Sequence, residues 1–161
     1  MHAGPIVIGF DGSPAARQAV QESGMLLAGR PAVVVVVWKQ GLAFEVLELP
    51  TIVGLPPVQL DIRTALQIDQ QMYERAQQLA QQGAELAREA GLEARSLAVA
   101  EDPDVPVGDV LVRVARERDA AAVVVGPHGH GSLAQVLPGR ISNDVMRSAE
   151  CPVVLVRPHE H

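Results

Sequence analysis

Short apolar runs alternate along the chain with amphipathic helical patterns. The longest run, AVVVVVW (32–38), is continuously apolar, which is typical of a central strand buried on both faces of a sheet. Together with four other short apolar runs it predicts five strands, at 5–10, 32–38, 94–100, 120–126 and 152–157. Strands separated by helices require crossover connections, so the pattern predicts a parallel sheet.

Helical patterns fill the intervals between these strands. Ser13 is a good N-cap and Pro14 a good first residue for a helix that runs to about Gly29. A longer helix, ended by Gly91, is indicated by an apolar face that recurs in alternating steps of four and three residues: Met72, Ala76, Leu79, Gly83, Leu86 and Ala90. Two more helices are predicted over 107–118 and 140–149.

This order of elements predicts an α/β fold, a doubly wound five-stranded parallel sheet in the order 3-2-1-4-5 with helices on both faces. Ligands of such sheets bind at the carboxyl ends of the strands, where the strand order reverses. Here that point lies between the first and fourth strands. The first strand ends at Asp11-Gly12-Ser13 and the fourth at Gly126, so two polar, turn-rich loops are expected to meet there.

The length of 161 residues predicts one domain spanning 1–161. Aromatic residues make up only 2% of the chain, so its core is expected to be aliphatic. Residues 39–59 contain two glycines and three prolines and are expected to form an irregular insertion that packs on a partner or on the long helix. Trp38, just before it, is open to three interpretations: contact with a bound base, contact with the insertion, or core packing.

Charge and cysteine content exclude several classes of protein. The net charge of −6 argues against nucleic-acid binding, which depends on neutralising phosphates, but not against a small anionic ligand. The run 32–38 is far shorter than the roughly 20 residues of a membrane span. Cys151 is the single cysteine and the N-terminus has no signal-peptide pattern, so no membrane association and a cytoplasmic location are expected.

The segment VVVGPHGHGSLAQVLPGRISNDV (123–145) is the strongest candidate for chemistry. Its glycines follow a strand and precede a helix, as in a phosphate cradle built from backbone N–H groups; Arg140 adds a cation and Ser142 a hydroxyl. A glycine-rich surface loop before a capped helix remains the alternative. His128 and His130 could begin a metal site, but no third ligand of matching spacing is visible, so no metal-binding residue is assigned.

The spacing Gly126-x-x-Gly129, nine residues, Gly139 and then Ile141-Ser142 resembles the signature of the universal stress protein family. The opening IVIGFDGSPAARQAV and the closing CPVVLVRP are similar to the two ends of that family, so the resemblance spans the chain. It implies the same α/β fold, ATP as the ligand with Mg²⁺ on its phosphates, and a homodimer formed through the last strand, 152–157.

The resemblance also implies the binding residues, by position. Asp11 matches an acidic residue near the ribose or phosphates, and Val37 a residue whose backbone meets the adenine. The glycine signature supplies the phosphate loop: Gly126, His128, Gly129, Gly139, Ile141 and Ser142. Arg140 departs from the family, which has Ser or Thr there in ATP-binding members; it removes a hydroxyl but can make a charge-assisted contact.

The predicted function is that of an ATP-binding regulator or sensor in a stress response, not a dedicated enzyme. No nucleophile with an adjacent base is visible, so no catalytic residue is assigned. Two alternatives stay open: a dimeric interaction module that does not bind nucleotide, and a slow ATPase. Asp11 has a second interpretation, as the acceptor of an Asx turn before the first helix. Arg140 likewise has an alternative to a bound anion, which is an ion pair with Asp144.

Overall fold

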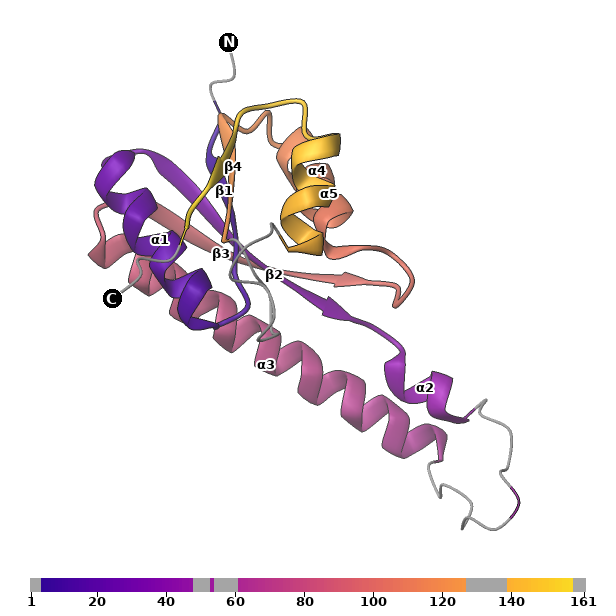
Figure 1. The fold of residues 1–161 in the computed structure, drawn as a ribbon. Coiled ribbons are helices and arrows are strands. Elements are labelled where there is room, and N and C mark those ends of the chain that lie inside the picture. Colours follow the sequence, from indigo (N-terminus) through magenta and orange to yellow (C-terminus); the bar gives the residue numbers. More distant parts are fainter. Residues whose placement is uncertain (1–3, 48–52, 54–60, 127–138, 158–161) are drawn as a thin grey trace.

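The computed structural model describes residues 4–47, 53, 61–126 and 139–157 (Figure 1). Strands and helices alternate along the chain as the sequence predicts. The strands are β1 (Ile6–Gly9), β2 (Pro31–Lys39), β3 (Glu93–Glu101), β4 (Ala122–Val125) and β5 (Val153–Leu155). The helices are α1 (Pro14–Leu26), α2 (Leu42–Leu47), α3 (Ile62–Glu89), α4 (Val107–Glu117) and α5 (Arg140–Ser148).

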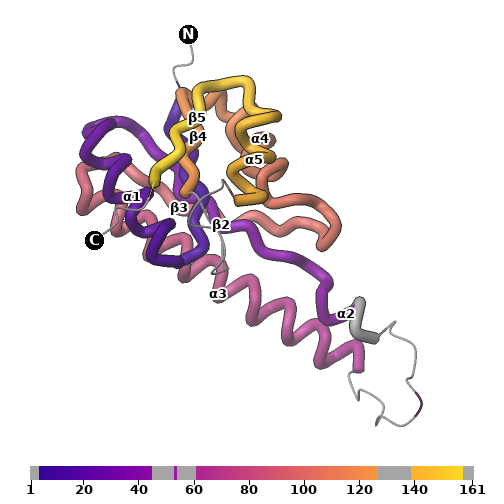
Figure 2. The backbone as a smooth tube through the Cα atoms, in the orientation of Figure 1, coloured from indigo at the N-terminus to yellow at the C-terminus, as the bar shows by residue number. Residues whose placement is uncertain are grey.

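All neighbouring strands are parallel, and their order is β3-β2-β1-β4-β5, which confirms the predicted topology. The strands differ in length. β2 and β3 pair from Pro31↔Glu93 to Lys39↔Glu101, whereas β1 pairs with β2 only as far as Gly9↔Val35. The ends of β2 and β3 therefore continue beyond β1 as a two-stranded extension, along which α3 also runs (Figure 2).

Helices cover both faces of the sheet. Residues of α1 and α3 pack with Ile6, Ile8 and Val34 on one face, while α4 and α5 pack with Val7 and Val35 on the other. Alternate β2 side chains thus enter opposite cores, which explains its continuously apolar sequence. In the part of the chain that the structure describes, no helix has both the length and the hydropathy of a membrane span.

The segment predicted to be an irregular insertion begins with regular structure instead. β2 extends through Lys39, and α2 follows after Gly41, whose φ of 82° suits glycine. The carboxylate of Asp69 on α3 accepts the Gly41 N–H at 3.1 Å and fixes the start of α2. Residues 48–52 and 54–60 of the expected insertion lie outside the described residues.

Trp38 packs within the protein, in agreement with the core-packing interpretation. It contacts the core between the sheet and α3, and its ring centroid lies 5.8 Å from that of Tyr73. This contact attaches the N-terminal half of α3 to the end of β2.

We predict that Gly83→Ala destabilises the fold. A Cβ at Gly83 would lie 2.7 Å from Val34 Cγ1 and 2.8 Å from Phe10 Cδ1, in the core under α3. We expect a loss of about 1–3 kcal/mol, because overpacking at a buried contact exceeds the better helix propensity of alanine. Urea unfolding measures the change. The control is Gln82→Ala, an exposed neighbour, which should have an unchanged or slightly higher midpoint.

Candidate functional site

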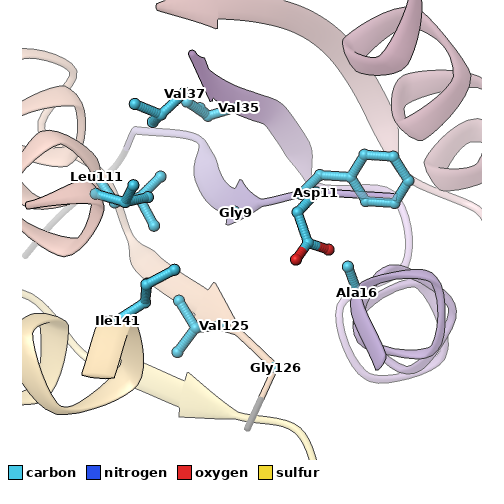
Figure 3. Close-up of a pocket in the computed structure, with 11 residues that line it drawn as sticks. Gly9, Asp11, Ala16, Val35, Val37, Leu111, Val125, Gly126 and Ile141 are labelled. Atoms are coloured by element: carbon cyan, nitrogen blue, oxygen red, sulfur yellow. The ribbon is translucent and has the colours of Figure 1, made fainter. Parts of the chain in front are cut away.

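A cavity of about 130 Å³ lies at the carboxyl ends of β1, β2 and β4 (Figure 3). This is the point where the strand order reverses, as predicted. Aliphatic side chains of β2, α4 and α5 lie on one side of it, and Asp11 and Ala16 on the other. The lining residues are Gly9, Phe10, Asp11, Ala16, Val35, Val37, Val107, Leu111, Val125, Gly126 and Ile141.

The lining of the cavity is suited to a flat apolar group. Among the described residues that line it, Asp11 is the only ionisable one, and aliphatic side chains dominate the remainder. An apolar protein cavity of roughly 150 Å³ accommodates benzene. The volume here is therefore appropriate for an aromatic ring, with Asp11 at one side for polar contact.

Among the described residues, no strand pairs with the peptide edge of Val37 that borders this cavity. The Phe10 N–H donates to the Val35 carbonyl at 2.9 Å, so the backbone of Val35 faces β1. Backbone direction alternates along a strand, so the N–H and C=O of Val37 face the same side. Since the pairing of β1 with β2 ends at Gly9↔Val35, Val37 has no β1 residue opposite it. A donor and an acceptor are thus available to the edge of a heteroaromatic ring.

Asp11 forms the turn that follows β1. Its Oδ1 accepts the Ser13 N–H at 2.9 Å, and Ser13 Oγ accepts the Ala16 N–H at 3.1 Å. The Asx-turn interpretation and the Ser13 N-cap are therefore both confirmed. Among the described residues, Asp11 Oδ2 has no hydrogen-bond partner, which leaves it as an acceptor beside the cavity.

The N-terminus of α5 lies beside the end of β4. Gly139 is its N-cap, with φ −65° and ψ 167°, and as a glycine it offers no side chain to cap the first turn. The buried Ser142 donates its hydroxyl hydrogen to the Gly126 carbonyl at 2.7 Å. That hydrogen is therefore already committed to a contact that joins α5 to β4.

Arg140 is exposed at the first position of α5. The suggested pairing with Asp144 is wrong: Asp144 binds Arg147 at 2.9 Å, because Arg147 lies one turn along α5 on the same side. The expected contributions of His128 and Gly129 lie outside the described residues. Within the residues that are described, no group of three His, Cys, Asp or Glu side chains could hold a metal ion.

Several lining residues were not singled out from the sequence. Val107 and Leu111 of α4 supply one wall, and Gly9 leaves room for it, since a Cβ there would lie 2.8 Å from Leu111 Cδ1. The available signal was the i, i+4 apolar spacing of Val107 and Leu111 at the start of a helix. That spacing shows an inward face, but not which neighbour it faces.

A hydrogen-bonded brace holds this wall in place. Lys39 Nζ, at the end of β2, donates to the carbonyls of Asp102, at 3.3 Å, and Val105 in the loop that leads to Val107. Glu101 binds Arg113 of α4 at 2.5 Å, and the hydrogen bond from Arg113 lowers the pKa of the Glu101 carboxyl. The ends of β2 and β3 thus fix the position of α4 over the cavity.

A parallel sheet whose strand order reverses beside such a cavity defines a doubly wound α/β protein, a class in which ligands bind at that reversal. The universal stress protein family model matches residues 3–157, and the chain belongs to this family. It is 32% identical to the universal stress protein Rv2005c of Mycobacterium tuberculosis over 165 residues, covering 95% of this chain and 45% of the relative. The chain thus spans about half the length of that relative.

Solved structures share the fold at low sequence identity. A universal stress protein from Archaeoglobus fulgidus in complex with dAMP aligns with a TM-score of 0.58 and 20% identity, covering 96% of this chain and 98% of the other. A universal stress protein family member from Arabidopsis thaliana with AMP bound aligns with a TM-score of 0.59 and 15% identity, covering 97% and 92%.

We predict that Ser142→Ala weakens the attachment of α5 to the sheet. The Gly126 carbonyl loses its donor; because Gly126 is half-buried, water replaces part of the lost bond, and we expect a cost of about 1 kcal/mol in unfolding free energy. Chemical denaturation measures it. Ser148→Ala, at an exposed position at the other end of α5, serves as the control and should be neutral. Equal midpoints for the two variants would contradict the attachment.

Proposed function

We propose that this protein binds an adenine nucleotide in the cavity and acts as a regulatory protein of the stress response rather than as a dedicated enzyme. The observation that carries the proposal is the aliphatic cavity bordered by the unpaired peptide edge of Val37. An adenine ring presents a donor and an acceptor along one edge, which complements such a peptide. The dAMP and AMP complexes of the two structural relatives support this choice of base.

The remaining parts of the nucleotide follow from the position of the base. With the ring against Val37 and Leu111, the ribose would lie near Asp11, whose Oδ2 can accept a hydroxyl hydrogen. The phosphates would extend toward the first turn of α5, where backbone N–H groups and the positive end of the helix dipole favour an anion. The glycine signature completes this proposed phosphate site: Gly126, His128, Gly129, Gly139, Arg140, Ile141 and Ser142.

The geometry refines two of these roles. The Ser142 hydroxyl already donates to Gly126, so its proposed phosphate contact is through the backbone N–H. Arg140 is exposed next to the same turn, where a cation is unfavourable unless an anion is bound nearby. We therefore assign Arg140 to the phosphates, in place of the hydroxyl that ATP-binding relatives carry.

ATP with Mg²⁺ is the proposed ligand form. Mg²⁺ usually keeps several waters and needs one or two carboxylates besides the phosphates, and Asp11 supplies a carboxylate at the cavity. Nucleotide bound at the N-terminus of α5 would stabilise this helix and β5, which follows it. Since 152–157 is the proposed homodimer strand, occupancy would bias association. Regulation in a reducing cytoplasm is consistent with the single cysteine.

We predict that Val107→Trp weakens nucleotide binding by filling the cavity. The indole would occupy the space assigned to the adenine, so the affinity for ATP and for AMP should fall by roughly tenfold or more. Isothermal titration calorimetry with each nucleotide measures this. Met146→Trp introduces the same side chain at an exposed position of α5 and should leave both affinities unchanged. If purified wild-type protein gives no saturable signal with either nucleotide, the interaction-module alternative holds.

A second substitution tests the phosphate site alone. Gly139 has an extended φ of −65°, which any residue adopts, so Gly139→Val should keep the fold. Its branched side chain would block the approach of phosphate, and ATP binding should weaken strongly. The unfolding free energy should fall by no more than about 1 kcal/mol, the cost of a poorer N-cap residue. An unchanged ATP affinity would place the phosphates elsewhere.

The substitution Arg140→Ser distinguishes the contribution of the phosphates to affinity from that of the base. If Arg140 makes a charge-assisted contact, ATP affinity should fall by about tenfold, since such bonds contribute about 1.5–3 kcal/mol, while AMP affinity changes less. Titrations of both nucleotides at the same ionic strength measure the difference. Tighter ATP binding by Arg140→Ser would instead mark the arginine as a defect in the site.

A further inference from the structure

β3 is an edge strand of the sheet, and one side of its backbone faces outward. The Glu93 N–H donates to the Arg30 carbonyl and the Glu101 carbonyl accepts the Gln40 N–H, so the odd-numbered residues of β3 face β2. Backbone direction alternates along the strand, and the even-numbered peptide groups therefore face away from the sheet. In the part of the chain that the structure describes, no strand pairs with this side.

Only part of this edge is covered by other groups. At one end, Arg88 Nε of α3 donates to the outward carbonyl of Ala94 at 3.0 Å. Past that point the outward peptide groups are those of Ser96, Ala98 and Ala100, whose side chains are small. Ser96 and Ala100 are exposed and lie symmetrically about Ala98. Such an edge is a template for an added strand.

The β3 side chains that face α4 are complementary to those of a second, antiparallel copy of the same strand. Leu97 and Val99 are partly buried against the α4 core, and Arg95 is exposed on the same face. In an antiparallel pair centred on Ala98, Leu97 of one chain would lie opposite Val99 of the other. Arg95 would lie opposite Glu101, the residue already bound to Arg113. Opposite charges and branched apolar side chains in directly opposed positions stabilise a sheet.

Charge also selects this register over its neighbours. A pair centred on Leu97 would place Glu93 opposite Glu101, a repulsive contact. A pair centred on Val99 would place Glu101 opposite Leu97. Only the register centred on Ala98 pairs Arg95 with Glu101 and keeps the apolar residues together.

We propose that the β3 strand of a second copy of this chain pairs with the β3 edge, antiparallel and centred on Ala98, so that the two sheets form one continuous sheet. This surface is at the opposite edge of the sheet from β5 and does not depend on nucleotide. Paired residues that face outward exchange N–H···O=C bonds, which satisfies the free peptide groups of both copies.

Disulfide crosslinking tests the register directly, in a Cys151→Ser background that removes the native thiol. The variants Ser96→Cys and Ala100→Cys carry tags of different size. Each variant is oxidised alone, and an equimolar mixture of the two is oxidised in parallel. Cys at these two positions would be directly opposed across the pair, whereas identical positions lie roughly 14 Å apart along the strands at about 3.4 Å per residue. We expect a disulfide between the two different variants in the mixture, and no crosslinked dimer of either variant alone.

Ala98→Pro tests association without crosslinking. The Ala98 N–H faces outward, so proline removes no bond of the protein's own sheet but blocks the added strand. Multi-angle light scattering across a concentration series should show a lower mass for this variant than for the wild type, with an unchanged unfolding midpoint. Arg95→Glu, which opposes Glu101 with a like charge, should weaken association in the same way.

Two results would overturn the proposal. One is equal crosslinking in the mixture and in the single variants, or none in any sample. The other is a solution mass that Ala98→Pro and Arg95→Glu leave unchanged, which would assign any association to another surface such as β5.

Discussion

The unequal length of β1 and β2 is the constraint on which the site depends. β1 stops at Gly9 because Asp11 and Ser13 form an Asx turn and a helix cap, with Gly12 between them at φ 78°. β2 continues to Lys39 because β3 pairs with it throughout. The cavity occupies the space that a longer β1 would fill, and the peptide of Val37 has no partner in β1 for the same reason. A fully matched sheet would have neither.

The position of α5 is set more by α4 than by the sheet. Gly108 allows the two helices to meet closely, since a Cβ there would lie 2.6 Å from the Cβ of Asp144 and 3.0 Å from the Ile141 carbonyl. Ser142 then fixes α5 to the end of β4. Together these contacts hold Ile141 against the cavity and keep the first turn of α5 beside Gly126. A helix that is held at two points keeps its N–H groups in a fixed direction, which an anion site requires.

Much of the fold could be predicted from the sequence, because each local signal has a direct structural cause. Ser13 and Pro14 begin α1, the apolar run 32–38 lies in β2, and the helices between strands require a parallel sheet, here in the common doubly wound order. α2 was missed because its six residues lie among glycines and prolines, and because the capping contact comes from Asp69, distant in sequence.

The site was less accessible to sequence reasoning. The ends of the first and fourth strands, at Asp11 and Gly126, were expected to meet at the reversal of strand order, and both residues line the cavity. Ile141, which the family resemblance assigns to the phosphate loop, lines it as well. The wall formed by Val107 and Leu111 depends on how α4 crosses the sheet, which periodicity does not specify. The hydrogen bond from the Ser142 hydroxyl to the Gly126 carbonyl likewise depends on how β4 and α5 lie together, which the sequence does not specify.

Lys39 connects the two sides of the cavity. It lies two residues after Val37 in the same strand and supports the loop before Val107 on the other side of the cavity. One strand therefore carries both the recognition edge and the support of the facing wall. Asp69 of α3 binds the Gly41 N–H at the start of α2, and Tyr73 of α3 contacts Trp38 of β2, so α2 and α3 are both anchored to the end of the strand that borders the cavity.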